Sequence, residues 1–404
     1  MAKILISSLG TGDIKKDSDQ DYKKTIYKID GKEYPETLTA KVLIEHFKID
    51  KVIFIGTNKS MWDNLYYSFN GEDEEYLDEL TTEKQNGIQL AKLKKLNSQI
   101  DSFLNFKGST SILIEYEKNN ADEIWDNFEI LLNIKKYIND GDEIYLDITH
   151  GFRYMPILNI FLLEFISIFD APSVEIKGVF YGMFSENKSE IIDFKIFFDL
   201  LEWSKAISMF KHNSNAEQLV MLLSKEDSNN DVAKVFTQFS NNLQLANMSS
   251  LWQFIKDANR KIKKIKESNN KIIKLLSDEL ITITSRFDTD IQSNFQYELA
   301  KWLYENKSYA LSYLALYEAI ISKSCELKNY DLDEYSQREE AKKSLGDDKY
   351  GRYFYTKHDD SISQIRNNIV HQSNERKDKV NQDIQKLPIF IDTFESYFTI
   401  RIGK

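Results

Sequence analysis

Residues 143–153, EIYLDITHGFR, decide how the first half of this chain folds. They begin with a short apolar and β-branched run that is typical of a buried strand. Small and polar residues follow from Asp147 to Arg153, and residues 154–169 then have the length and apolar content of a helix. This order of strand, polar loop and helix is how an open α/β sheet presents a ligand site at the carboxyl end of a strand. We therefore expect residues 147–153 to bind a ligand.

Two other predicted strands end in similar loops. Residues 4–6 are followed by SSLGTG at 7–12, and residues 52–55 are followed by GTNKSMW at 56–62. Because the carboxyl ends of parallel strands lie on one edge of a sheet, we expect the three loops to converge on one crevice. The predicted ligand-binding residues are Ser8, Leu9, Gly10, Thr11, Gly12, Thr57, Asn58, Lys59, Ser60, Trp62, Thr149, His150, Gly151 and Arg153.

The residue types in these loops suit a ligand that carries phosphates. Lys59, Arg153 and the backbone N–H groups at helix starts would together suit phosphates or the polar edges of a nucleotide. Trp62 could stack on a base, although a tryptophan on a helix more often belongs to the core.

Two other kinds of site are disfavoured. SSLGTG lacks the third glycine of the dinucleotide fingerprint, which argues against an ordinary NAD site. Asp147 and His150 could be mistaken for part of a hydrolase triad, but the chain has no G-x-S-x-G elbow. We expect His150 to donate to a ligand or to cap a loop.

The first 200 residues alternate strands with helices, which predicts a doubly wound, Rossmann-like sheet that is mostly parallel and has an antiparallel edge. Asp30-Gly31 is a strong two-residue hairpin signal, and Pro35 with Glu36 predicts the first turn of a helix. The predicted strands are 2–8, 51–55, 112–116 and 143–148, with hairpins over 25–34 and 174–194; the predicted helices are 35–47, 121–137 and 154–169.

Helical apolar spacing continues from residue 197 to the C-terminus, which predicts an all-α second part. Pro388 is the one proline in this part, and glycine is nearly absent before Gly346. The basic run 260–274 could be a nucleic-acid stripe, but isoleucines at 262, 265 and 272 favour a solvated helix with one buried face. We predict three parts: residues 1–200, a helical linker at 201–280, and a helical domain at 281–404.

Residues 366–371, RNNIVH, carry the chemistry of the second part. Ser361 with Gln364 fits a capping box, which predicts a helix start just upstream. Ile362 and Ile369 place Arg366 on the apolar stripe, so that its guanidinium should point into a pocket or an interface. His371 lies roughly 140° around the helix and roughly 7.5 Å along it from Arg366. The two could share a phosphate if the arginine reaches across, or if two chains pair these helices.

Arginine and histidine together suit RNA cleavage. Histidine can move a proton near neutral pH, and arginine can clamp a phosphate without a metal. Both roles fit attack of an RNA 2′-hydroxyl on the neighbouring phosphate, a reaction that DNA would resist. An arginine and a histidine five residues apart also arise often by chance. The pair alone therefore does not decide between a catalytic site and a helix without a catalytic role.

Composition excludes several classes of protein. With 404 residues the chain is too long for one core, and 42% hydrophobic with 29% charged residues indicates a globular protein. Its net charge of -11 argues against broad adhesion to nucleic acid or anionic lipid. Cys325 is the only cysteine and no Cys/His cluster has zinc spacing, so we expect no metal site and a reducing, cytoplasmic location. No segment suggests secretion or a membrane.

Taken together, SLGTG, GTNKSMW, DITHGFR and RNNIVH resemble the motifs of the CRISPR-associated CARF–HEPN ribonucleases, the accessory effectors of type III systems. The resemblance covers nearly the whole chain, although residues 201–280 carry none of its motifs. It implies a Rossmann-like CARF domain that binds a cyclic oligoadenylate, with the tetra-adenylate as the expected activator. It also implies an all-α HEPN domain that cleaves single-stranded RNA without a metal through Arg366, Asn367 and His371. Homodimers that can assemble further, a ring on their twofold axis and a HEPN site built by both chains are implied as well.

The sequence therefore predicts a cyclic-oligoadenylate-activated, metal-independent endoribonuclease of type III CRISPR antiviral defence. The alternative is a CARF regulator whose helical domain binds a partner or DNA without catalysis. Slow cleavage of the cyclic oligoadenylate by the CARF domain itself is compatible with either function.

Overall fold

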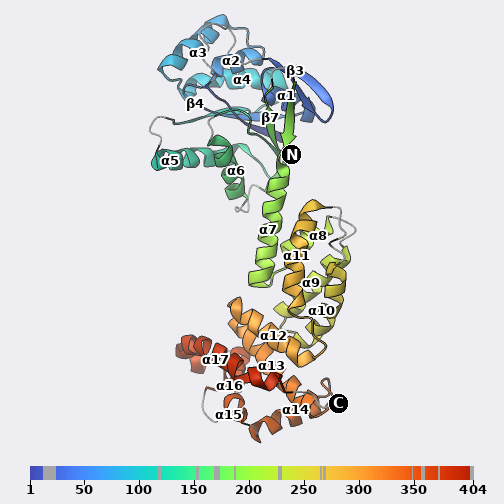
Figure 1. Ribbon diagram of the computed structural model, residues 1–404. Helices are drawn as coiled ribbons and strands as arrows, with labels where there is room; N and C mark the ends of the chain where they lie inside the picture. The colour runs from blue at the N-terminus through green and yellow to red at the C-terminus, as the bar shows by residue number, and fades with distance from the viewer. Residues whose placement is uncertain are drawn as a thin grey trace. The chain divides into compact units, whose positions relative to one another are not determined.

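The computed structural model describes residues 1–11, 24–116, 120–151, 154–167, 173–185, 188–225, 230–263, 266, 270–347, 349–355, 360–371 and 374–400. The chain divides into two compact units, Met1–Phe198 and Asp199–Lys404. The first contains a sheet with helices on both of its faces (Figure 1). The described residues of the second form helices and the turns that join them.

The sheet of the first unit has eight strands among the described residues, in the order β3-β2-β8-β7-β6-β1-β4-β5. Neighbouring strands are parallel from β5 through β4, β1 and β6 to β7, and β2 is parallel to β8, whereas β8 is antiparallel to β7 and β3 is antiparallel to β2. The predicted mostly parallel sheet with an antiparallel edge is therefore confirmed. The strands are β1 (Lys3–Ser8), β2 (Thr25–Ile29), β3 (Lys32–Glu36), β4 (Lys51–Thr57), β5 (Thr110–Ile114), β6 (Glu143–Asp147), β7 (Glu175–Met183) and β8 (Lys188–Asp193).

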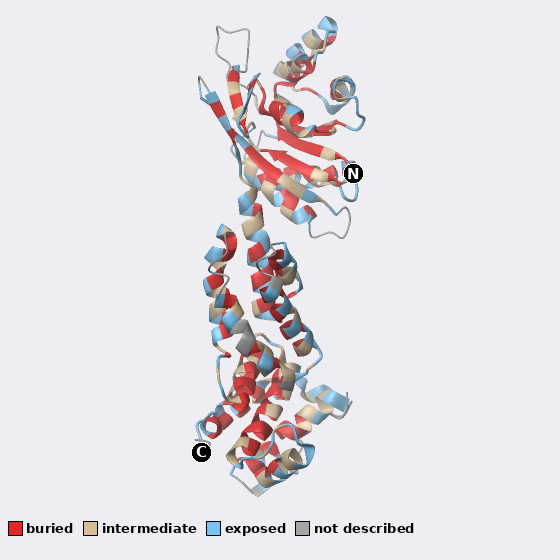
Figure 2. Ribbon diagram, turned by 90° about the vertical axis from the view of Figure 1, so that its right-hand side faces the viewer, coloured by how far each residue is buried: buried red, intermediate tan, exposed pale blue. Residues whose placement is uncertain are grey.

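Helices cover both faces of the sheet because its central strands are apolar on both faces. In β1, Leu5 packs into the core on one face, whereas Ile4 and Ile6 pack into the core on the other. The first core contains residues of α1 (Thr39–Phe47), α2 (Trp62–Ser68), α3 (Glu74–Asn86) and α4 (Leu93–Leu104). The second contains residues of α5 (Ala121–Leu132) and α6 (Met155–Ile166). Figure 2 shows the central strands as buried.

The predicted helix at 35–47 begins too early. Pro35 and Glu36 belong to β3, where Pro35 pairs with Ile26, and α1 begins at Thr39. Because β3 is an edge strand of the sheet, a proline without an N–H can be accommodated there. The hairpin at Asp30-Gly31 is confirmed, since both residues have positive φ, 48° and 76°.

The described residues of the second unit contain no strand, which confirms the predicted helical second part. One continuous core runs from Trp203 to Phe398. The basic run 260–274 is not a single helix, because α10 ends at Lys263 and α11 begins at Lys271. Ile262 and Ile272 are buried as predicted, and Ile265 lies outside the described residues.

The predicted boundary between the linker at 201–280 and the domain at 281–404 falls inside a helix. Residue 280 lies within α11, and the division into three parts stays a prediction. The helices are α7 (Lys195–Asn213), which begins in the first unit, α8 (Glu217–Ser224), α9 (Asn230–Gln244), α10 (Met248–Lys263), α11 (Lys271–Ser285), α12 (Gln292–Glu305), α13 (Tyr309–Leu327), α14 (Tyr335–Ser344), α15 (Gly351–Phe354), α16 (Ile362–His371) and α17 (Val380–Phe398).

Candidate functional site

The three predicted ligand loops leave three adjacent strands. β1 lies between β6 and β4, so the polar residues after Ser8, Thr57 and Asp147 stand next to one another on the carboxyl edge of the sheet. The register supports this arrangement, with Ser7 opposite Asp147 and Ser8 opposite Ile55. We call this region the sensor edge, after the ligand-binding role that the sequence predicts for its loops.

Hydrogen bonds lock the first two loops to each other. Ser60 Oγ donates to the carbonyl of Leu9 at 2.8 Å, and the Met61 N–H donates to the carbonyl of Gly10 at 3.0 Å. Ser60 Oγ also accepts from the Thr57 N–H at 2.9 Å. Ser8, Leu9, Thr57 and Ser60 are buried. These four buried residues support the accessible residues of the sensor edge.

Trp62 is a core residue. Its side chain is fully buried and its indole N–H donates to the carbonyl of Thr57 at 2.8 Å. Gly56 packs against the same ring, since a Cβ there would lie 2.7 Å from it. The base-stacking role considered for Trp62 does not fit this position. The buried indole instead fixes the geometry of the loop at 57–62.

The third loop is anchored through Asp147. One carboxylate oxygen accepts from Ser7 Oγ at 2.8 Å and the other accepts from the Thr149 N–H at 3.0 Å. Asp147 is completely buried, which fits an anchor of the loop rather than a member of a surface triad. Gly151 has φ of +102° and a Cβ there would lie 2.9 Å from Ser8, so glycine is required where these two loops meet.

His150 lies beside this anchor. Burial lowers the pKa of its imidazole below the ordinary value, and the negative charge of Asp147 opposes that shift without cancelling it. The ring is therefore neutral at pH 7, with one nitrogen as donor and the other as acceptor. A neutral imidazole can hydrogen-bond either to a base edge or to a ribose hydroxyl.

Several predicted ligand residues remain accessible at the sensor edge. Lys59 and Gly151 are exposed, and Gly10, Thr11 and Asn58 are half-buried. Thr149 is half-buried, and its hydroxyl accepts from the Gly182 N–H at 2.8 Å. Gly12 and Arg153 lie outside the described residues.

Two further residues at this edge escaped the motif analysis. Asn159 on α6 is fully buried and its amide donates to Ser8 Oγ at 2.9 Å. Thr39, at the start of α1, is also fully buried, and a Cβ on Gly182 would lie 2.8 Å from its hydroxyl. The signal for Asn159 was available, since it is a polar residue inside an apolar helix. No sequence pattern marked Thr39, because only the order of the strands in the sheet brings it to this edge.

The RNNIVH residues form the last turns of α16. Ser361 Oγ accepts from the Gln364 N–H at 3.2 Å, which is the predicted cap. Ile362 and Ile365 are buried, and Asn367 and His371 are exposed. Asn367 and His371 therefore lie at the surface of a helix that is anchored by its other face.

Arg366 lies between these two faces. Its guanidinium is stacked over the ring of Tyr317, 4.8 Å from the centroid, and Nη1 donates to the Asn367 side chain at 3.2 Å. Nε is buried and has no hydrogen-bond partner among the described residues. Tyr317 is itself stacked on Phe354 at 5.2 Å, so that an aromatic pair fixes the arginine close to the exposed Asn367.

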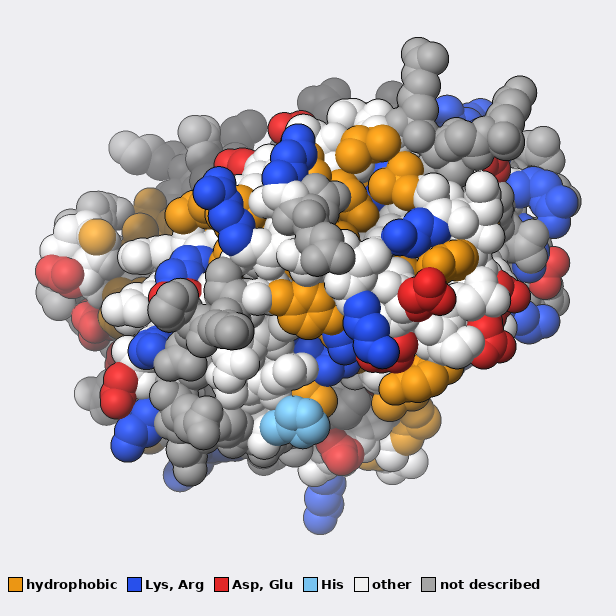
Figure 3. Space-filling model, turned by 90° about the horizontal axis from the view of Figure 1, so that it is seen from below, with side chains coloured by type: hydrophobic (Ala, Val, Ile, Leu, Met, Phe, Trp, Pro, Cys, Tyr) orange, Lys and Arg blue, Asp and Glu red, His pale blue; other side chains and the backbone are white. Residues whose placement is uncertain are grey.

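Further positive charge lies around α15, which contains Phe354. Gly346, Lys349, Gly351, Arg352 and Tyr355 line an open hollow of about 630 Å³. Burial is the largest single influence on the pKa of Lys342 and works to lower it, but the hydrogen bond to Tyr317 and the charges of Tyr317, Tyr355 and Glu339 together outweigh burial and raise the pKa. Lys342 is therefore cationic beside the ring that supports Arg366. Figure 3 shows Lys and Arg side chains interspersed with apolar ones on one face of the molecule.

The described residues contain no cluster of three or more His, Cys, Asp or Glu side chains that could hold a metal ion. Within the same part of the chain, no helix is both long and apolar enough to cross a membrane.

Comparisons with known proteins agree with the two-unit structure. Residues 4–185 match the family described as CRISPR system endoribonuclease Csx1, CARF domain. Residues 199–294 match the second domain of CRISPR-associated protein MJ1674. Over 411 aligned residues the chain is 33% identical to CRISPR-associated protein MJ1674 of Methanocaldococcus jannaschii, and the alignment covers 93% of this chain and 63% of that protein.

These matches identify the first unit. It is a CARF domain similar to that of Csx1, and the helices that follow it are similar to the second domain of MJ1674. The chain spans less than two thirds of the length of its MJ1674 relative. Neither family match extends over residues 366–371, so that the hexad rests on its own sequence and geometry.

Proposed function

We propose that this CARF-domain protein is a metal-independent endoribonuclease that cyclic oligoadenylate activates and that cleaves single-stranded RNA in type III CRISPR defence. The observation that carries the proposal is the end of α16, where Arg366 is held over Tyr317 beside the exposed Asn367 and His371. A description of the Csx1 family as an endoribonuclease supports the same activity. The first unit would sense the activator and the helical unit would cleave RNA.

The chemistry follows from the residue types in the hexad. The 2′-oxygen attacks the neighbouring phosphorus, the bond from phosphorus to the 5′-oxygen breaks, and the products are a 2′,3′-cyclic phosphate and a 5′-hydroxyl. His371 would move the proton, either from the attacking hydroxyl or to the leaving oxygen. Arg366 would stabilise the negative charge that develops on the phosphate oxygens, and Asn367 would fix the orientation of the guanidinium. A second chain would supply the second histidine if the site is shared about a twofold axis.

The sensor edge has the donors that a ring of nucleotides requires. The backbone of 10–11 and 58–59, the ammonium of Lys59 and the neutral His150 would contact phosphates, riboses and base edges of a cyclic oligoadenylate, with the tetra-adenylate as the expected ring. Because such a ring has approximate twofold symmetry, we propose that a homodimer binds it between two CARF domains.

The test is the His371→Ala variant. We expect it to lose RNA cleavage while it still binds the activator, because the two sites lie in different units. Labelled RNA and a DNA of matching sequence are incubated with full-length protein, with or without tetra-adenylate and with EDTA present. We expect cleavage of RNA only, in the presence of activator, with 2′,3′-cyclic phosphate ends or their 3′-phosphate hydrolysis product.

The matched control is Gln385→Ala, at an exposed position on α17 of the same unit, which should cleave normally. Full cleavage by His371→Ala would contradict the assignment, and a strict requirement for magnesium would indicate a different mechanism. Activator binding without cleavage by the wild-type protein would favour the regulator that binds a partner or DNA. The amount of intact tetra-adenylate in the same reactions measures slow cleavage of the ring by the CARF domain.

A further inference from the structure

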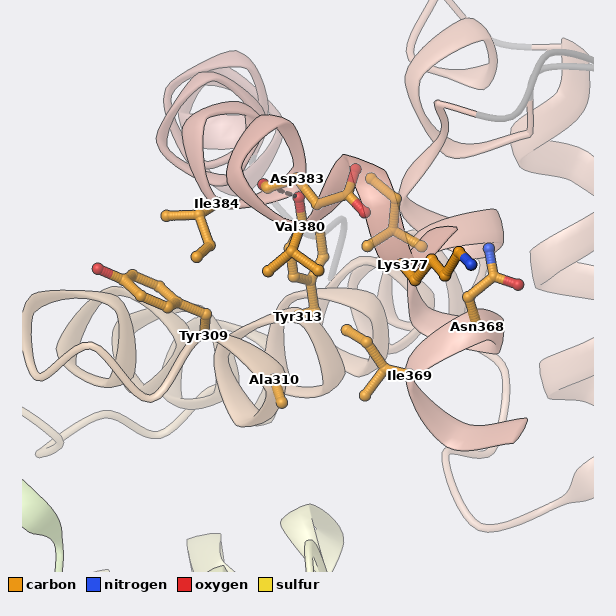
Figure 4. Close-up of a pocket in the computed structure, with 10 residues that line it drawn as sticks. Tyr309, Ala310, Tyr313, Asn368, Ile369, Lys377, Val380, Asp383 and Ile384 are labelled. Carbon is orange, nitrogen blue, oxygen red and sulfur yellow. Dashed lines mark hydrogen bonds between the residues drawn. The ribbon is translucent and has the colours of Figure 1, made fainter. Parts of the chain in front are cut away.

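A cavity of about 310 Å³ lies beside α16 in the helical unit. Figure 4 shows it between three helices, with residues of α13 on one side, α17 on the opposite side and α16 at one end. Sites of this kind that bind small ligands typically have volumes from about 300 to 1,000 Å³. The cavity is therefore large enough for one small group and too small for an oligonucleotide.

The walls of the cavity are mostly apolar and partly aromatic. Tyr309 and Tyr313 come from α13, Ile369 comes from α16, and Val380 comes from α17. The hydroxyl of Tyr313 donates to the carbonyl of Asp383 at 2.7 Å, which ties α13 to α17 and fixes one wall. A flat aromatic ligand would find stacking surface here without first ordering the side chains that bind it.

Polar groups lie at the end of the cavity that adjoins the hexad. Asn368 and Lys377 stand next to each other in Figure 4. Asn368 directly follows Asn367 in the chain and lies one helical turn before His371, so that the two side chains are neighbours on α16. A group bound in the cavity would therefore be held close to the reacting phosphate.

We propose that this cavity receives one nucleobase of the RNA substrate and thereby sets the base preference of cleavage; the proposal rests on the proposed ribonuclease function. The side-chain amide of Asn368 both donates and accepts, as recognition of a base edge requires. The ammonium of Lys377 would contact the phosphate attached to that nucleoside. Asn368 and Lys377 act as specificity residues, distinct from Arg366, Asn367 and His371.

The principal test fills the cavity. Ala310 lines it but is itself exposed on α13, so Ala310→Phe adds a ring without removing core packing. We expect KM for RNA to rise by roughly ten-fold with little change in kcat, since one base contact is lost and the reacting groups remain. Gln385→Phe is the matched control, because it adds the same ring at an exposed position of α17 that does not line the cavity.

A second variant tests recognition of the base. Asn368→Asp keeps the shape of the side chain and replaces its donor with an acceptor. Cleavage of four RNAs that differ only at the base next to the scissile phosphate should then follow a changed order of preference, by roughly ten-fold for the favoured base. Wild-type cleavage together with an unchanged KM in Ala310→Phe and an unchanged order in Asn368→Asp would overturn the cavity proposal and leave the proposed function standing.

Binding provides a readout that does not depend on cleavage. Calorimetry with the four ribonucleoside monophosphates and the full-length wild-type protein should show binding that Ala310→Phe loses and Gln385→Phe keeps. Such binding in a protein that does not cleave RNA would show that the cavity binds a nucleotide, but it would overturn the proposed function and with it the role of the cavity in the base preference of cleavage. Binding that Ala310→Phe leaves unchanged would overturn the cavity proposal. Loss of a dimer on Ala310→Phe substitution, seen by sedimentation, would also overturn it, because the cavity would then belong to an interface between two chains.

Discussion

The backbone and the side chain of Lys59 have separate roles. Its backbone N–H donates to the hydroxyl of Thr57 at 3.2 Å and helps to form the turn, whereas its ammonium is exposed at the sensor edge. A substitution of the side chain therefore leaves the turn intact. The same separation does not hold for Ser60, whose hydroxyl is buried in the loop contacts.

We expect Lys59→Ala to weaken activation by the ring. Loss of one charge-assisted contact to a phosphate costs about 1.5 to 3 kcal/mol, which is roughly ten- to a hundred-fold in affinity. The tetra-adenylate concentration for half-maximal RNA cleavage measures the effect. Lys59→Arg, which keeps a cation, should activate nearly as the wild type does. Equal activation of Lys59→Ala and the wild type would place this side chain outside the ligand contacts.

His150 should make stability depend on pH. Its pKa is lowered in the folded protein by burial, so below the ordinary value of 6.5 the unfolded chain binds a proton that the folded chain resists. The free energy of unfolding therefore falls as the pH drops below 6.5, and it levels off once the pH passes the lowered pKa of the folded state. Denaturant unfolding of the wild type and of His150→Gln at pH 7.5 and pH 5.5 measures this. A loss on acidification that is equally large in both proteins would show that other groups cause it.

At the scale of elements, the anchored parts of helices and loops fix the positions of the residues that we propose to react or to bind ligand. α16 begins at its Ser361 cap and packs through Ile362 and Ile365, while its last turn presents the hexad. At the sensor edge the loops after β1 and β4 hold each other by hydrogen bonds from Ser60 and Met61. At α16 residues outside the hexad determine where its residues lie, whereas at the sensor edge residues of two motifs hold each other in place.

Ser361→Ala should loosen the start of α16. Loss of a side-chain cap costs about 1 kcal/mol, whereas glycine at the same position costs only a few tenths. Amide hydrogen exchange of α16 should therefore report a free energy of local opening that is lower by about 1 kcal/mol in Ser361→Ala and nearly unchanged in Ser361→Gly. The rate of RNA cleavage should fall in the same order. Identical exchange in all three proteins would show that packing alone fixes the helix.

At the scale of the whole molecule, the residues proposed for sensing and those proposed for cleavage lie in separate units. Residues of the sensor edge belong to the unit Met1–Phe198, and the hexad belongs to the unit Asp199–Lys404. The proposed activation would therefore have to change an equilibrium between two states of the protein, for which the ligand has different affinities. A shift from mostly inactive to mostly active requires a preference of about 5.5 kcal/mol, which contacts from two chains to one ring could supply.

We therefore predict a dimer that binds one ring of four adenylates for every two chains. Calorimetry measures the stoichiometry, and sedimentation with and without the ring measures the assembly. One ring bound per chain would contradict the shared site. So would a monomer that cleaves RNA at the full activated rate. In the predicted dimer, linkage requires that a variant which favours the active state also binds the ring more tightly.

Local patterns in the sequence were sufficient for much of the fold. Apolar runs with helices between them predicted the parallel sheet, Asp30-Gly31 predicted the hairpin, and Ser361 with Gln364 predicted the cap of α16. Each depends on residues that are close together in the chain, so their physical cause can be read from spacing and residue type. The same patterns selected the loops that follow β1, β4 and β6, because strand ends can be recognised from sequence.

Tertiary structure alone decided which of those residues face outward. Trp62 has the residue type of a base-stacking group, yet the fold buries it against Gly56, whereas Lys59 in the same loop is exposed. Pro35 has the residue type of a helix start, yet it lies in a strand because β3 forms an edge of the sheet. The position of Arg366 over Tyr317 likewise joins two helices that are distant in the sequence. Burial and long-range contacts depend on how all the elements pack together, which no local window of the sequence contains.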